Sequence, residues 1–129
     1  MIDISKAKIA FKKFLDKYED KSDLSFQLKV VHTYHVAENS KYIAEKLNLS
    51  KEDIELAELI GLLHDIGRFS QWTKNKSFND ELLDHAQLGC EILFSEGKIK
   101  DYDVQESDYE IIKKAILNHN KFKIDDDLT

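Results

Sequence analysis

The chain has 129 residues, no proline, four glycines and a formal charge of −6 at pH 7. This length suits one domain with a single core, and the scarcity of turn residues beside plentiful helix formers predicts an all-α fold. The acidic balance argues against a broad nucleic-acid surface, although bound metal ions could still attract a small phosphorylated substrate.

The sequence also restricts the setting in which the protein works. Cys90 is the single cysteine, so it cannot form an internal disulfide. The N-terminus lacks the basic stretch and apolar run of a secretory signal, and no apolar stretch approaches the roughly 20 residues that span a bilayer. We therefore expect a cytoplasmic protein with no membrane partner.

Apolar residues at helical spacing predict a compact antiparallel bundle of about five helices, forming a single domain over residues 1–129. The segment 66–83 is expected to be a long connection. In the second helix, an apolar stripe predicts that His32 lies on the core-facing side, near the start of the helix. The predicted helices cover residues 5–18, 29–47, 51–65, 84–95 and 107–118. The stripe consists of Leu28, Val36, Ile43 and Leu47.

The third predicted helix is apolar nearly all round, which is typical of a buried central element. Ser50 and Asp53 predict a capping box at its start. Gly61 lies inside it, where glycine costs roughly 1 kcal/mol against alanine, so we expect another backbone or side chain to approach closely there. Further on, Gly97 is placed to end the fourth helix, and Ser107 with Glu110 predicts a second capping box.

Four histidines fall on the core-facing sides of different predicted helices. Because successive helices pack antiparallel, two histidines at helix starts and two at helix ends reach the same end of the bundle. A lone inward histidine is more often a hydrogen-bonded core residue than a ligand. Four together favour a metal site, since each imidazole needs partners for both ring nitrogens. The four are His32, His64, His85 and His119. His35 is rotated away from His32, and we expect it to support a ligand or to fill a packing position.

Asp65 follows His64 directly, and adjacent residues on a helix diverge by about 100°. His64 and Asp65 can therefore bind one metal only if it lies across the end of the helix, with the two residues on different sides of it. This geometry suits a carboxylate that bridges two metals. Asp65 could give one oxygen to each of two metals, with His32 and His64 completing one site and His85 and His119 the other. Such ligands fit Mn, Fe, Co, Ni or Zn, or Mg if waters fill the shell, and spacing chooses neither the metal nor the number of ions.

The segment after the doublet supplies candidates for binding a substrate. Arg68 could hold a phosphate with two parallel hydrogen bonds, and a surface ion pair is an equal alternative. Phe69, Trp72 and Phe78 could stack on a base or anchor the segment, and anchoring is favoured for Phe78. The predicted substrate-binding residues are Arg68, Gln71, Lys74 and Asn120.

With these residues placed, the chain resembles the HD superfamily of metal-dependent phosphohydrolases over about residues 28 to 120. The resemblance implies that His32, His64 and Asp65 are metal ligands and that His85 and His119 bind a second metal or the substrate phosphate. The matching motifs are His32-Thr-Tyr-His-Val36, the doublet in Leu-Leu-His-Asp-Ile-Gly-Arg-Phe, Asp84-His85-Ala-Gln-Leu-Gly89 and Ile116-Leu-Asn-His-Asn120.

The resemblance further implies hydrolysis of a phosphate ester or anhydride, commonly of a nucleotide, by a water that the metal activates. We expect Asp65 to orient that water. The predicted catalytic residues are Asp65, Arg68, His85 and His119.

One departure from the family pattern leaves alternatives open. The family supplies a final metal-binding aspartate from a helix after the fourth histidine motif, and here only Asp125, Asp126 and Asp127 follow, a like-charge run typical of a solvated tail. We therefore expect a domain shortened at its C-terminus, with self-association through uncovered apolar surface. The alternatives to an enzyme are a catalytically impaired metal- or nucleotide-binding regulatory module and a helical scaffold with merely hydrogen-bonded histidines.

Overall fold

The computed structural model describes residues 2–79 and 84–128, with side chains described as far as Asn118. Its regular elements are all helical, which confirms the all-α prediction. The α-helices are α1 (Ile4–Leu15), α2 (Leu24–Lys46), α3 (Lys51–Leu63), α4 (Gly67–Asn75), α5 (His85–Cys90) and α6 (Tyr109–Leu128). Shorter turns are the 3-10 helices η1 (Glu19–Ser22), η3 (Lys98–Tyr102) and η4 (Glu106–Asp108) and the π-helix η2 (Glu91–Ser95).

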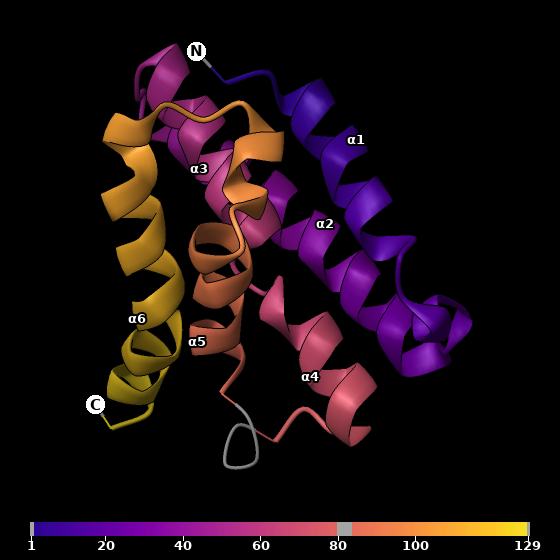
Figure 1. Ribbon diagram of the computed structural model, residues 1–129. Helices are drawn as coiled ribbons and strands as arrows, with labels where there is room; N and C mark the ends of the chain where they lie inside the picture. The colour runs from indigo at the N-terminus through magenta and orange to yellow at the C-terminus, as the bar shows by residue number, and fades with distance from the viewer. Residues whose placement is uncertain (1, 80–83, 129) are drawn as a thin grey trace.

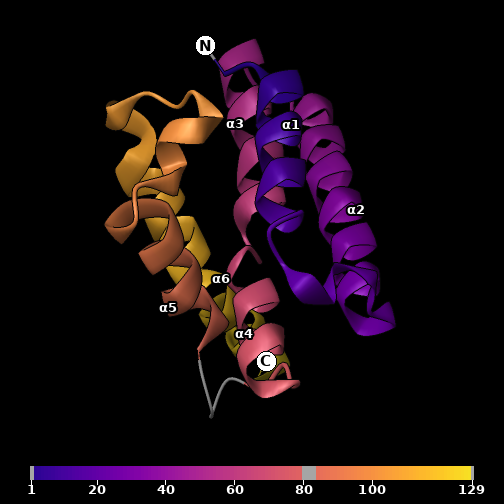
Figure 2. The ribbon, with the colours of Figure 1, turned by 45° about the vertical axis from the view of Figure 1, so that its right-hand side comes forward.

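The helices form two groups that enclose one core (Figure 2). One group holds α1, α2 and α3, the other α5 and α6, and α4 lies below and contacts both α2 and α5. Chain direction alternates through α1, α2 and α3, and again from α5 to α6, as an antiparallel bundle requires (Figure 1). Because α3 contacts α1, α2 and α6, it is the central helix, as its all-round apolar sequence predicted.

Short polar side chains begin several of these helices. The carboxylates of Asp3, Asp23 and Asp84 accept backbone N–H groups at the starts of α1, α2 and α5. The hydroxyl of Ser50 accepts the N–H of Asp53 at 3.1 Å, which confirms the predicted cap of α3. The second predicted capping box lies differently, because Ser107 falls inside η4 and α6 begins only at Tyr109.

The buried face of α2 differs from the predicted apolar stripe. Leu28, Ile43 and Leu47 are 58 to 65 % exposed, so the stripe does not face the core. The buried residues of α2 are Phe26, Thr33, Ala37 and Ala44. The reason is a close approach to α3: a Cβ atom at Gly61 would lie only 2.8 Å from the Cα of Ala37. The predicted close contact at Gly61 is confirmed, and small side chains at Ala37 and Ala44 allow the middle and end of α2 to bury this face.

The segment predicted as a connection after the doublet contains α4. Phe69 on this helix is buried, with its ring 4.8 Å from that of Phe26 and 6.0 Å from that of Phe11. Lys76, in the left-handed conformation, ends the helix. These aromatic contacts come from α1 and α2, so no short-range pattern revealed them. Residues 80–83 lie outside the described part of the segment.

Two features of the C-terminal half bear on the predictions. Gly97 has a φ of +79° and follows the helical run that ends at Ser95, as predicted. Helix α6 continues past the predicted end at Asn118 to Leu128, and the side chains of Asp125, Asp126 and Asp127 lie outside the described residues.

Two observations concern the predicted setting. Cys90 is buried and free, and desolvation raises the pKa of its thiol. Among the helices described, none has the length and apolar character needed to cross a bilayer.

Candidate metal centre

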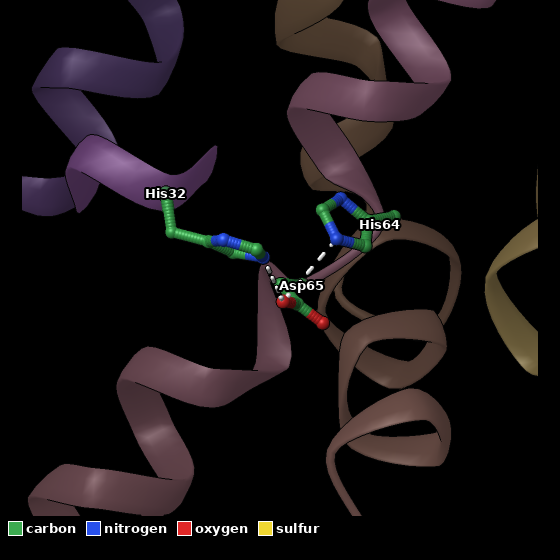
Figure 3. Close-up of side chains that lie close together, drawn as sticks. All are labelled: His32, His64 and Asp65. Carbon is green, nitrogen blue, oxygen red and sulfur yellow. Dashed lines mark ion pairs between the residues drawn. The ribbon is translucent and has the colours of Figure 1, made fainter. Parts of the chain in front are cut away.

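The carboxylate of Asp65 lies at the junction between α3 and α4 and is only 7 % exposed. Its Oδ2 atom lies 3.2 Å from Nε2 of His64 and 3.9 Å from Nε2 of His32 (Figure 3). Its Oδ1 atom lies 3.2 Å from Nε2 of His85. One buried carboxylate therefore faces imidazoles from α2, the end of α3 and the start of α5.

A backbone hydrogen bond fixes the orientation of His64. Its Nδ1 donates to the carbonyl oxygen of Gly61 at 2.6 Å, since a carbonyl can only accept. In the neutral ring, this places the proton on Nδ1 and leaves the lone pair of Nε2 directed toward Asp65. Metal-binding histidines are commonly held in this way, with the distal N–H bonded to a carbonyl or carboxylate.

His32 takes a more open position than predicted. Its side chain is 52 % exposed, so it lies at the edge of the buried face of α2 and not within it. Helix α2 also begins at Leu24, about one and a half turns before the predicted start at residue 29. The inward orientation was wrong because the apolar stripe that predicted it faces solvent. The consequence is that His32 is half exposed to solvent at one side of the cluster.

His85 is fully buried and is held next to Asp65 by a close backbone contact. A Cβ atom at Gly67 would collide with the carbonyl oxygen of His85 and lie 2.7 Å from the backbone nitrogen of Gly89. Only a glycine therefore allows the start of α4 to touch the start of α5. Sequence analysis missed this role of Gly67, and its place two residues after Asp65 was the available signal.

The donor atoms suit a divalent metal. One ligand atom from each of His32, His64 and Asp65 lies within 4.8 Å of the others. Metal bonds of about 2.0–2.2 Å place neighbouring ligand atoms roughly 3 to 4 Å apart, and the distances of 3.2 and 3.9 Å from Oδ2 fall in this range. Two imidazoles and a carboxylate are a donor set that transition metals accept. These three residues could therefore hold a metal ion.

Lys29 also reaches the cluster and was not predicted. Its Nζ lies 3.8 Å from Oδ2 of Asp65 and 5.3 Å from the ring centre of Phe78, and its side chain is 22 % exposed. The signal was its position three residues before His32, which places the two on neighbouring turns of one helix face. A cation thus stands at the open edge of the centre.

Arg68 and Gln71, two predicted substrate-binding residues of α4, form hydrogen bonds that fix the segment from α4 to Phe78. Nη1 of Arg68 donates to Oε1 of Gln71 at 2.9 Å and to the carbonyl of Phe78 at 2.8 Å. Gln71 is fully buried, so it positions Arg68 and has no surface to offer a substrate. Phe78 packs against Trp72 with 5.1 Å between ring centres, which fits the predicted anchoring role. Lys74 is exposed on the last turn of α4.

The side chains of two predicted site residues are outside the described part of the chain, and His35 lies outside the cluster. The side chains of His119 and Asn120 lie outside the described residues, although their backbone belongs to α6. His35 is exposed on α2 and lies outside the cluster of His32, His64 and Asp65.

Together, the helical bundle and the carboxylate shared by several histidines define a protein with the fold and donor set of a metal-binding helical domain. Residues 30–128 match the HD domain family, and the chain belongs to this family, whose members are generally metal-dependent hydrolases. No curated protein and no solved structure gives a significant match to the chain.

Proposed function

We propose that this protein is a metal-dependent phosphohydrolase that acts on a small phosphate ester or anhydride, such as a nucleotide. The observation that carries the proposal is the buried carboxylate of Asp65, whose two oxygens face different imidazoles at 3.2 Å. A buried carboxylate with histidines on both sides is costly unless cations or protons compensate it. A metal ion supplies that compensation and the chemistry of the family.

The two oxygens divide the roles of the histidines. His32, His64 and Oδ2 of Asp65 would hold the first metal, while His85 on Oδ1, with His119, would hold a second metal or contact the substrate phosphate. A bound divalent ion, of Mn, Fe, Co, Ni, Zn or Mg, would lower the pKa of a water and withdraw charge from the phosphoryl oxygens.

The side chains around the ions have their own tasks. Asp65 would accept a hydrogen bond from the attacking water and so orient it toward phosphorus. Lys29 stands on the open side, where its ammonium group can bind a phosphoryl oxygen and neutralise part of its charge. Arg68 would keep the segment from α4 to Phe78 in place, and it remains a predicted contact of the substrate phosphate. Lys74 and Asn120 remain predicted substrate contacts.

The test is hydrolysis by the purified chain with Mn, Co, Ni, Zn or Mg. Phosphomonoesters, phosphodiesters and nucleoside phosphates would be offered in turn, and phosphate release would be measured. We expect metal-dependent turnover that Asp65→Asn abolishes, because the amide keeps the size and loses the anionic ligand. Asp53→Asn, an exposed change on α3, the helix that precedes Asp65, should retain activity.

Two outcomes would decide against this function. Full activity in the Asp65→Asn protein would refute the assigned site. Stoichiometric metal without turnover on any substrate class would show the alternative, a metal- or nucleotide-binding regulatory module.

A further inference from the structure

A second group of charged residues lies away from the metal centre, in a cavity of about 380 Å³ between α1 and η3. Figure 1 shows η3, in orange, beside α1 and at a distance from the junction of α3 and α4. The cavity is within the size range of small-molecule sites. We refer to it as the lysine pocket, after Lys6, Lys13, Lys17 and Lys98 in its lining.

The charge of the lysine pocket is opposite to that of the whole chain. Four lysines and one acid, Asp101, give it a formal charge of +3 (4 − 1), whereas the chain carries −6. The three lysines of the N-terminal segment are spaced by seven and four residues, which places them on one side of α1 and its continuation. None of the four forms an ion pair within the described residues, while nearby Lys21 pairs with Asp16 at 3.6 Å.

Two of these lysines influence each other electrostatically. A side-chain interaction with Lys98, the repulsion between the two ammonium groups and desolvation lower the pKa of Lys17, while the carboxylate of Asp101 raises it. Neighbouring like charges disfavour each other even where solvent screens them. An anion placed between the two would turn the repulsion into two charge-assisted hydrogen bonds.

The remaining lining gives the pocket an apolar wall. Ala10, Phe14 and Tyr102 belong to it, and Ile9 is 58 % exposed. A ligand that suits both parts carries several negative charges at one end and an apolar or planar body at the other. Lysines spread along α1 and η3 match a chain of linked phosphates better than a single anion.

We propose that the lysine pocket is a binding site for an oligophosphate, either inorganic or the phosphate chain of a nucleotide, separate from the metal centre. Lys17 and Lys98 bind one phosphate group between them, and Lys13 and Lys6 bind the groups that follow. The apolar wall then receives the organic part of a nucleotide. The site needs no metal, so it stands whether or not the chain hydrolyses phosphate.

The experiment is a calorimetric titration of the full chain with inorganic tripolyphosphate, in metal-free buffer at fixed ionic strength. Two double variants remove the same charge: Lys17→Ala with Lys98→Ala in the pocket, and Lys12→Ala with Lys100→Ala, on α1 and η3 but outside it. We expect the wild type and the second variant to bind equally. The pocket variant should lose about tenfold or more in affinity, roughly one charge-assisted hydrogen bond or more.

Location and folding are checked in the same proteins. Amide shifts on titration should centre on Lys17 and Lys98, and melting curves should agree among the three proteins, since none of the replaced side chains is buried in the core. Equal losses in both variants, no binding by the wild type, or shifts centred on Asp65 would each overturn the proposal.

Discussion

The metal centre and the lysine pocket hold their charges in different ways. Asp65 is buried and faces residues from three helices whose backbones touch, whereas the lysines of the pocket extend from exposed or half-buried positions on α1, the turn after it and η3. The first arrangement depends on packing, because a shift of one helix moves a ligand atom out of reach. The second depends mainly on charge, because long side chains adjust to a bound anion. A substitution that disturbs helix packing should therefore weaken mainly the metal centre, and a change in charge or ionic strength should weaken mainly the lysine pocket.

The largest expected effect comes from Gly67→Ala. The added methyl group would collide with backbone atoms of His85 and Gly89, which cannot move without shifting α5. We expect a loss of about 1 to 3 kcal/mol in the free energy of unfolding, together with weaker metal binding. Tripolyphosphate binding at the lysine pocket should be unchanged. Urea unfolding and metal titration measure the two effects.

Gly97→Asn is the matched control for this change. Gly97 has open space around it, and asparagine tolerates its positive φ, so stability and metal affinity should stay close to the wild type. If Gly67→Ala were as stable as Gly97→Asn and bound metal equally well, the packing account of His85 would be wrong.

Lys29→Ala should move two properties of the metal centre in opposite directions. The ammonium group of Lys29 lies 3.8 Å from Oδ2 of Asp65 and repels a metal cation bound there. Its removal should therefore raise metal affinity by a few fold. Phosphate, measured as a competitive inhibitor, should bind about tenfold more weakly, because a charge-assisted contact is lost. The control is Lys41→Ala, an exposed lysine of α2 outside the centre. Unchanged phosphate inhibition would remove Lys29 from the substrate site.

The smallest and most general effect is that of salt. Raising the ionic strength about tenfold shortens the screening length from about 10 Å to about 3 Å, which weakens exposed charge contacts more than buried ones. Tripolyphosphate binding should therefore fall steeply with salt, and metal binding at Asp65 should fall less. Parallel titrations at two salt concentrations compare the slopes. Equal slopes would mean that the two sites do not differ in the way described.

Part of this molecule could be read from the sequence because the information is local. The His64 and Asp65 doublet, the cap at Ser50 and the close contact at Gly61 each rest on a few neighbouring residues, and the structure has all three. The family resemblance placed the doublet in the same way, through a short motif.

The parts that failed depend on distant neighbours. The buried face of α2 is set by Ala37 against Gly61, so a rule that ranks residues by apolar size chose a different face. Phe69 makes α4 a packed helix only through rings from α1 and α2. Lys29 belongs to the centre only because α2 and the end of α3 lie together. The lysine pocket joins residues from α1 and η3, which no sequence spacing connects.

The central claim is that imidazoles around Asp65 hold a metal ion, and metal titration of three proteins tests it most directly. The metal-free wild type, His64→Ala and His35→Ala would be titrated with Mn and with Zn and followed by calorimetry. We predict that the wild type and His35→Ala bind at least one ion per chain with the same affinity. His64→Ala should bind at least about 100-fold more weakly, because it removes a metal ligand. Even the loss of a residue that only orients a ligand costs about 10- to 100-fold in metal affinity. Equal binding by all three proteins, or none by the wild type, would contradict the account.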